Sequence, residues 1–172
     1  SGVKSLIISP GVPLRQPLII QAAIAGLFIT SELAVAFSML KNEKVIAVTG
    51  SIGKSTTTAL IAEAAKTVDA NTVAVGNIGK PLAEYILEVL QRKRARAQFL
   101  PMELSSFQLE NFSNLSVPYS VITFLTPNHM ERYENLKAYY ETKWFLVERT
   151  KRKSFLNAES SDLLFFSKRK FS

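Results

Sequence analysis

The sequence predicts an α/β protein in which a mostly parallel sheet is covered by helices on both faces. Short apolar segments typical of buried strands alternate with longer segments of helical periodicity. A glycine-bearing turn joins one of these strands directly to a helix, which is the arrangement of a phosphate loop. Hydrophobic residues make up 47% of the chain and charged residues 20%. That composition indicates a globular domain and argues against a disordered chain.

The first forty residues are expected to form two strands, each followed by a helix. Residues 4–9 have the pattern of a strand, and residues 16–25 that of a helix. A short strand is expected at residues 27–30. Ser31 is a suitable N-cap for the helix after it, because its hydroxyl can accept a hydrogen bond from the first helical turn.

The rest of the chain continues the alternation. Residues 44–49, KVIAVT, form an apolar strand that ends at the glycine turn. Further strands are expected at residues 72–75, 97–103, 119–125 and 153–156. Helices are expected at residues 54–66, 81–92 and 135–149. A chain of 172 residues is long enough for one domain with a core and too short for two large ones.

The clearest local motif is the glycine turn after residue 49. It has the compact form GxxGK[ST], since Val48 stands where the longer form of the motif has its first glycine. Glycines allow backbone N–H groups to approach phosphates, and the helix N-terminus favours negative charge. Lys54 is expected to reach the β- and γ-phosphates of a nucleotide, and the Ser55 hydroxyl to bind Mg²⁺. The expected nucleotide-binding residues are Gly50, Ser51, Ile52, Gly53, Lys54, Ser55 and Thr56.

Polar side chains occur where other predicted strands end. Glu103 closes one strand, and His129, the only histidine, follows another. Ligands of doubly wound sheets bind beyond the carboxyl ends of the strands. The topology therefore predicts that Lys54, Glu103 and His129 lie at one edge of the sheet. A carboxylate is a suitable oxygen ligand for Mg²⁺, whereas histidine is a less usual one.

Lys143 has two interpretations. It shares a helix face with the apolar residues Leu136, Tyr140 and Val147. Its stem can cover apolar surface while the amine reaches water. Alternatively, the amine is desolvated, has a lowered pKa and reacts with CO₂ to form a carbamate.

The net charge is +7, and basic clusters lie at residues 92–96, 149–153 and 168–170. Nucleic-acid binding is one interpretation, but no aromatic residues are interleaved with the clusters. We favour basic helix ends and a basic tail, and expect no nucleic-acid partner. The most apolar region, residues 18–40, is interrupted by polar residues, so no stable membrane insertion is expected. The absence of cysteine fits the cytoplasm.

Together these motifs resemble the Mur ligase family of amide ligases. Residues 49–56, TGSIGKST, look like its nucleotide loop, and residues 103–109, ELSSFQL, resemble the form of its D-glutamate-adding member. Lys143 falls where the family has its carbamylated lysine. Four more segments resemble the family in its order, namely SPGVP at 9–13, GNIGKP at 76–81, HMERY at 129–133 and NAESSDL at 157–163.

The resemblance implies an enzyme of peptidoglycan biosynthesis. ATP would convert the carboxylate of UDP-N-acetylmuramoyl-L-alanine to an acyl phosphate, which the amine of D-glutamate would attack. Asn77, Ser105 and Gln108 would contact the UDP-muramoyl substrate. A cytoplasmic monomer with these small-molecule partners is expected.

The resemblance also implies the catalytic residues, which are Lys54, Glu103, His129 and Lys143. Lys54 would neutralise charge on the γ-phosphate. Ser55 and Glu103 would hold one Mg²⁺, and His129 and carbamylated Lys143 a second.

Three positions depart from the family pattern. Asn128 replaces the acidic residue just before the histidine, so it brings no negative charge to orient His129. Phe124 stands where an asparagine is usual, which removes a polar contact. Pro127 replaces a position that is often acidic.

The resemblance further implies a division of the chain. Residues 1–40 would be the end of an N-terminal domain and its connection, and residues 41–172 part of a central ATP-binding domain. The C-terminal domain of a whole ligase would be absent. We therefore expect a partial chain that does not turn over alone.

Two alternatives remain. One is another ATP-dependent amide ligase of the same fold, such as a folylpolyglutamate synthase, which the nucleotide loop alone does not separate. The other is a degenerate nucleotide-binding module without catalysis, which Phe124 and Asn128 favour.

Overall fold

A five-stranded sheet forms the centre of the molecule. The computed structural model describes residues 2–171, with the side chains of residues 2–168. The strand order is β4-β5-β3-β6-β7, and each pairing is parallel. The strands are β3 (Lys44–Thr49), β4 (Val75–Gly76), β5 (Phe99–Glu103), β6 (Val117–Ile122) and β7 (Thr150–Leu156). The predicted α/β class is confirmed.

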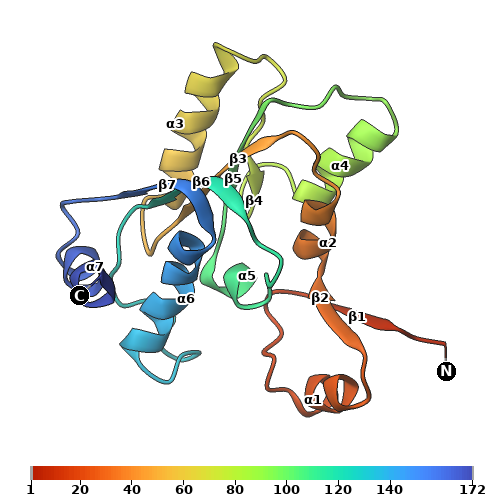
Figure 1. Ribbon diagram of the computed structural model, residues 1–172, viewed down its shortest axis with the longest axis vertical. Helices are drawn as coiled ribbons and strands as arrows, with labels where there is room; N and C mark the ends of the chain where they lie inside the picture. The colour runs from red at the N-terminus through yellow and green to blue at the C-terminus, as the bar shows by residue number, and fades with distance from the viewer. Residues whose placement is uncertain (1, 172) are drawn as a thin grey trace.

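Helices cover both faces of this sheet. They are α3 (Lys54–Lys66), α4 (Leu82–Leu90), α5 (Ser106–Glu110), α6 (Leu136–Glu148) and α7 (Ser161–Phe171). Figure 1 shows α3 on one side of the sheet and α5 and α6 on the other. The reason is the direction of the connections, since crossovers between parallel strands are right-handed. Along the strand order, the connection from β3 to β4 runs in one direction, and the connections from β4 through β5 and β6 to β7 run in the opposite direction. Helices of the two sets of connections therefore lie on opposite faces of the sheet.

The larger core cluster lies on the face opposite α3. It joins α4, α5 and α6 through side chains that include Tyr85, Leu109 and Leu146, all almost completely buried. Val45 and Ala47 of β3 enter it from the sheet. A smaller cluster joins Ile122 of β6 to the aromatic side chains of α6 and α7. The hydrophobic periods of the sequence thus correspond to buried faces.

The N-terminal residues form a small separate sheet. β1 (Ser5–Ile8) pairs in parallel with β2 (Phe28–Ser31), and α1 (Pro17–Ile24) connects them. The Ser31 hydroxyl accepts a hydrogen bond from the amide of Ala34 and caps α2 (Glu32–Ser38), as its sequence position predicts. α2 packs against α4 and shares the larger core. The domain boundary at residue 40 stays a prediction.

Two helices are not predicted by the sequence pattern, and one strand is shorter than predicted. α5 has 5 residues, too few to show a helical period, and α7 lies in a region where no helix was expected. The strand expected at residues 72–75 is reduced to Val75–Gly76, which forms the outermost strand of the sheet. The other predicted strands and helices are present with boundaries shifted by a few residues.

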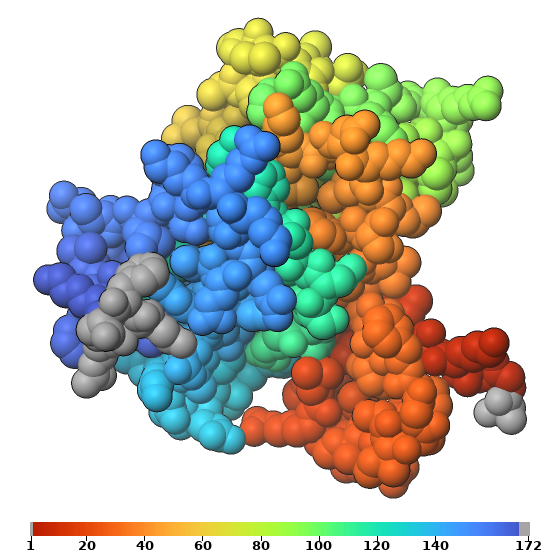
Figure 2. All heavy atoms as spheres, viewed as in Figure 1, coloured from red at the N-terminus to blue at the C-terminus, as the bar shows by residue number. Residues whose placement is uncertain are grey.

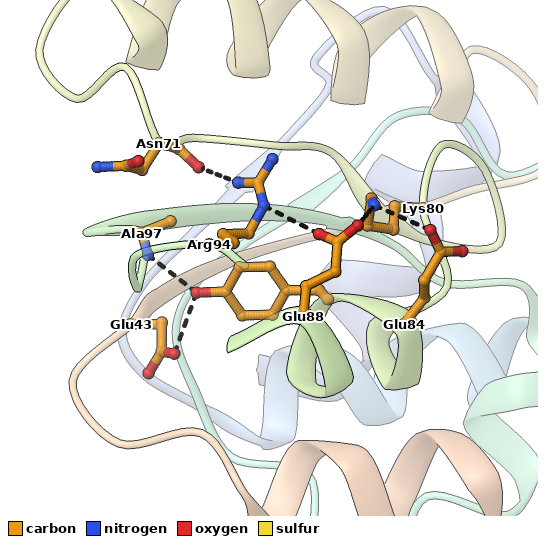
Figure 3. Close-up of polar contacts among 8 residues, drawn as sticks. Glu43, Asn71, Lys80, Glu84, Glu88, Arg94 and Ala97 are labelled. Atoms are coloured by element: carbon orange, nitrogen blue, oxygen red, sulfur yellow. Dashed lines mark hydrogen bonds and ion pairs between the residues drawn. The ribbon is translucent and has the colours of Figure 1, made fainter. Parts of the chain in front are cut away.

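Hydrogen bonds and ion pairs connect α4 to the surrounding loops (Figure 3). Lys80 donates hydrogen bonds to the carboxylates of Glu84 and Glu88, and Arg94 donates to Glu88 at 3.1 Å. The Tyr85 hydroxyl donates to Glu43 and accepts from the amide of Ala97 at 2.8 Å. Lys80 ends the turn that follows β4, so its ion pairs hold this turn against α4.

Candidate phosphate-binding site

The glycine turn lies at the carboxyl end of β3, the central strand of the sheet. Gly50 and Gly53 have φ angles of 149° and 81°, which disfavour other residues. A Cβ atom on Gly50 would lie 2.1 Å from Oγ1 of Thr123. The Thr123 hydroxyl donates to the carbonyl of Ile52 at 2.6 Å, and the amide of Ser51 donates to the carbonyl of Phe124 at 2.7 Å. The residues after β6 therefore fix the shape of the turn.

Helix α3 begins directly after this turn. Gly53 is its N-cap in the left-handed conformation, and 13 residues follow in helical geometry. The first N–H groups of a helix have no partners within the helix, and its dipole favours anions there. Lys54 is half-buried, and its amine donates to the carbonyl of Ser51 at 3.2 Å, while Ser55 and Thr56 are exposed. The turn and the helix start together present several donors to an anion.

Glu103 lies beside the turn, on the neighbouring strand. In the register of β3 and β5, Glu103 is opposite Val48, two residues before Gly50. Both strands run in the same direction, so Glu103 and Lys54 are at the same edge of the sheet, as their sequence positions predict. The carboxylate is 1% exposed. One oxygen, Oε1, accepts from the Asn77 amide at 2.8 Å, but Oε2 is buried with no hydrogen-bond partner among the described residues.

An unpaired carboxylate oxygen in this position points to a cation. Burying a charge without a partner costs several kcal/mol, roughly, unless an ion or donor compensates it. The carbonyl of Glu103 also lies 2.3 Å from where a Cβ of Gly76 would be, so the β4 turn approaches the same strand end closely. Glu103 therefore offers a buried carboxylate oxygen without a hydrogen-bond partner among the described residues, and its chemistry fits a ligand of Mg²⁺.

Lys143 is buried against the same turn. It is 1% exposed, and its amine donates to the carbonyl of Gly50 at 2.8 Å. The amine also lies 4.8 Å from the centre of the Tyr139 ring. The pKa of Lys143 is lowered to about 7, mainly because the amine is buried and also because Lys54 is positively charged, while the negative charge of Glu103 partly offsets these effects. The interpretation in which the amine reaches water is therefore wrong, whereas formation of a carbamate on the buried amine stays a prediction.

His129 lies apart from these three side chains. It is exposed, its φ of 54° is unusual for a residue other than glycine, and its ring centre is 5.0 Å from that of Phe107. Its Nδ1 is 3.6 Å from Glu131. Within residues 2–168, none of its contacts is with Glu103 or Lys143. The Asn128 side chain accepts from the backbone amide of His129 at 2.9 Å, so it does not orient the ring.

Among the residues whose placement the structure describes, no group of three or more histidine, cysteine, aspartate or glutamate side chains is arranged to hold a metal ion. The predicted ligand set of Ser55, Glu103, His129 and Lys143 includes only one carboxylate, and it stays a prediction.

The three predicted substrate contacts have partners within the protein. Asn77 bonds Glu103 through its side chain and through its backbone amide, which donates to the Glu103 carbonyl at 2.9 Å. Ser105 and Gln108 form a capping box at the start of α5, in which each side chain accepts from the backbone amide of the other. The capping box explains why α5 starts here, and the substrate contacts stay predictions.

Two features of the site have no local sequence signal. Ser51 is buried, and its hydroxyl donates to the Thr126 carbonyl and accepts from the Thr126 amide and the Tyr139 hydroxyl, at 2.7, 3.0 and 3.1 Å. A cavity of about 360 Å³ lies next to the loop and is lined by residues that include Gly53, Phe124 and Asn157. Tyr139 is 88 positions from Ser51, and such a distance hides the contact from pattern reading.

The parallel sheet and the glycine turn that opens α3 define a phosphate-loop α/β domain. The Mur ligase middle domain family matches residues 48–170 of the chain. The chain therefore belongs to the Mur ligase family.

Relatives and solved structures agree with this assignment. The chain is 39% identical to the UDP-N-acetylmuramoylalanine–D-glutamate ligase of Synechococcus sp. (strain JA-3-3Ab), over 86% of the chain and 33% of the relative. It is 38% identical to the ligase of the same name from Alkaliphilus metalliredigens, over 80% and 29%. The chain thus spans about a third of the length of these relatives.

The fold is similar to that of other ligases. A UDP-N-acetylmuramate:L-alanyl-γ-D-glutamyl-meso-diaminopimelate ligase from Neisseria meningitides superposes with a TM-score of 0.64, 14% identity, and coverage of 96% of this chain and 55% of that one. A UDP-N-acetylmuramoyl-L-alanyl-D-glutamate–2,6-diaminopimelate ligase gives 0.59 and 22%, with coverage of 89% and 40%. These likenesses support the fold. In the part of the chain that is described, no helix is long and apolar enough to span a membrane.

Proposed function

We propose that this chain is the ATP-binding part of a ligase that adds D-glutamate to UDP-N-acetylmuramoyl-L-alanine. The observation that carries the proposal is the buried, unpaired Oε2 of Glu103 beside a phosphate loop that Lys54 and Lys143 flank. The names of the relatives at 38–39% identity supply the substrates. The proposal includes a cytoplasmic, monomeric enzyme of peptidoglycan synthesis.

The residues of the loop would bind and orient the nucleotide. The turn residues 50–53 and the start of α3 would surround the phosphates, and Lys54 would leave the Ser51 carbonyl to meet the γ-phosphate. The cavity lined by Phe124 and Asn157 is adjacent to Gly53 and is suitable for the nucleoside part. Bound Mg²⁺ would neutralise phosphate charge.

We infer the metal ligands from the oxygen atoms of the site that have lone pairs available for an ion. Glu103 Oε2 is free and buried, and the Ser55 hydroxyl is exposed at the helix start, so these two would hold the first ion. For the second ion, Lys143 would first have to leave the Gly50 carbonyl and take up CO₂ as a carbamate. His129 would have to approach from its exposed position on the loop before α6. Asn77, Ser105 and Gln108 would face the UDP-muramoyl substrate.

Nucleotide binding with and without Mg²⁺ tests this proposal. The chain is titrated with ATP in a calorimeter, in Mg²⁺ and in EDTA, together with the Lys54→Ala variant. We expect Lys54→Ala to weaken binding by roughly tenfold to a hundredfold, the value of a hydrogen bond to a charged group. Lys66→Ala, at the far end of the same helix, is the control and should bind as the parent does. ATP binding that is equally tight in the parent and Lys54→Ala would refute the proposal.

A second candidate is a nucleotide-binding module without turnover, favoured by the separation of His129 from Glu103. It predicts ATP binding without phosphate release. The assay complements the chain with the remaining domains of a related ligase and supplies ATP, D-glutamate and UDP-N-acetylmuramoyl-L-alanine, in parallel with a folate substrate and L-glutamate. Phosphate release that depends on the muramoyl substrate favours the ligase, and release that depends on folate favours a folylpolyglutamate synthase.

A further inference from the structure

Arg132 connects three segments that are far apart in the sequence. Its Nε and Nη2 donate to the two carboxylate oxygens of Glu110 on α5, at 3.2 and 2.6 Å. Its Nη1 donates to the carbonyl of Gly11 at 2.9 Å, and Nη2 also donates to that of Pro10 at 3.3 Å. In Figure 2 the segment after β1 and the loop before α6 meet at the lower edge of the molecule.

The ion pair of Arg132 and Glu110 is better shielded than a usual surface pair. The two side chains are 14% and 20% exposed, and the contact is bidentate, through Nε and Nη2 of the guanidinium. Exposed ion pairs add little to stability, but bidentate, desolvated ones add both energy and a defined orientation. Tyr133 donates a further hydrogen bond to Glu110 at 2.5 Å. Glu110 therefore holds two neighbouring residues of the loop before α6.

Arg132 and His129 share an aromatic partner. The guanidinium carbon of Arg132 lies 4.4 Å from the centre of the Phe107 ring, and the imidazole of His129 lies 5.0 Å from the same ring. The amide of Arg132 also donates to the carbonyl of His129 at 3.0 Å. His129 has a positive φ, a conformation that surrounding contacts must maintain. Arg132 contacts the backbone of His129 and Phe107 contacts its ring.

We infer that Arg132 is a positioning residue that fixes residues 9–16 and the loop that carries His129 as one unit. It acts through Glu110 and Phe107, and it holds the segment between β1 and α1 by donating to the backbone carbonyls of Pro10 and Gly11. Arginine is suited to this task because its planar fork can satisfy a carboxylate and backbone carbonyls at once, whereas lysine has a single point of charge. The importance of this unit for catalysis rests on the proposed function, but its existence does not.

Two readouts report directly on the unit. The chain has one histidine, so the ring protons of His129 give unambiguous NMR signals, shifted by the nearby Phe107 ring. The amide of Val12 donates to the carbonyl of Ser9, so its hydrogen exchange reports the order of the segment that Arg132 holds. Neither readout requires catalysis or a bound nucleotide.

The experiment compares Arg132→Met and Arg132→Lys with the parent chain. For Arg132→Met we expect Val12 exchange to accelerate by roughly tenfold or more, the value of a charged hydrogen bond. The His129 ring signals should move toward the positions of an unstructured histidine. Arg132→Lys should restore part of the Val12 protection and less of the His129 shift. Arg149→Met is the matched control, since Arg149 also lies over a phenylalanine, at 4.8 Å from the Phe145 ring.

Glu110→Gln provides a second, milder variant should Arg132→Met fail to fold. It keeps the shape of the acceptor and removes its charge, so it should shift both readouts in the same direction by less. Unchanged Val12 exchange and His129 signals in Arg132→Met, or in Glu110→Gln if that variant alone folds, would overturn the inference. Effects no larger than those of Arg149→Met would overturn it as well. ATP titration of the same samples tests the proposed function separately.

Discussion

The amine of Lys143 donates to the carbonyl of Gly50 at 2.8 Å, so a buried lysine of α6 contacts the first glycine of the phosphate loop. The lysine is 1% exposed, and within residues 2–168 its amine bonds a backbone carbonyl and no carboxylate. Its charge is therefore stabilised by a carbonyl dipole and by the more distant Glu103, and opposed by Lys54. This arrangement makes the protonation of Lys143 a sensitive property of the site.

The first prediction concerns stability as a function of pH. The folded-state pKa of Lys143 is lowered to about 7 from its usual 10.5, so the unfolded chain binds more protons between these values. The contribution of Lys143 to stability should therefore increase as pH rises from about 7 to about 10. Urea unfolding at pH 7 and pH 9 measures it. Lys143→Met should lose this increase relative to the parent.

Lys137→Met is the control for this prediction, because Lys137 is exposed on the same helix. It should keep the pH dependence of the parent. If the parent and Lys143→Met gain the same stability between pH 7 and pH 9, the amine is not desolvated in the way that its burial implies.

The second prediction concerns Glu103. Glu103→Gln removes the charge of the unpaired Oε2 and keeps an acceptor for the Asn77 amide at Oε1. We expect ATP affinity in Mg²⁺ to fall to nearly the value measured in EDTA, because a neutral amide is a poor ligand for a hard cation. Calorimetric titration in both buffers is the measurement. Glu63→Gln, an exposed change on α3, should retain the Mg²⁺ dependence.

Much of this site could be predicted from sequence because its parts sit at strand ends. Gly50 and Glu103 follow or close apolar strands, and parallel strands bring such positions to one edge. Whether the Lys143 amine is buried or exposed could not be predicted in this way. A lysine on an apolar helix face is compatible with a buried or an exposed amine, and only the packing of α6 against the loop decides.

Other features were hidden for different physical reasons. The helix α5 depends on a capping box between Ser105 and Gln108 and is too short for a period. The hydrogen bond between Ser51 and Tyr139 is a tertiary contact without a local pattern. The sequence order predicts that His129 lies beside Glu103, but the side chain is exposed to solvent and its backbone has a positive φ. Sequence order after a strand places a loop at the right end of the sheet without fixing how far it reaches.

The third prediction concerns the close approach of the loop to β6. Gly50→Ala would place a Cβ 2.1 Å from Oγ1 of Thr123 and would require φ of 149°. We expect a loss of roughly 1–3 kcal/mol of stability, from steric overlap and backbone strain. Urea unfolding measures the loss. Gly11→Ala is the control, since nothing lies within 4 Å of a Cβ there.

A double variant separates the two causes. Gly50→Ala with Thr123→Ala removes the overlapping hydroxyl and leaves the strain. Partial recovery relative to the sum of the single changes is expected, as for residues in contact. Strict additivity would mean that the overlap is relieved by movement of the loop.

The last prediction concerns the hydroxyl of Tyr139, which is fully buried and donates to Ser51 at 3.1 Å. Tyr139→Phe should lower stability by about 1 kcal/mol, because Ser51 keeps its two bonds to Thr126. Ser51→Ala should cost more, and the double variant should cost less than the sum, since both changes remove one shared bond. Urea unfolding of the four proteins gives this coupling directly, with Tyr119→Phe on β6 as the matched control. A coupling of zero would show that the Tyr139 hydroxyl does not support the phosphate loop, and the buried network would then be confined to Ser51 and Thr126.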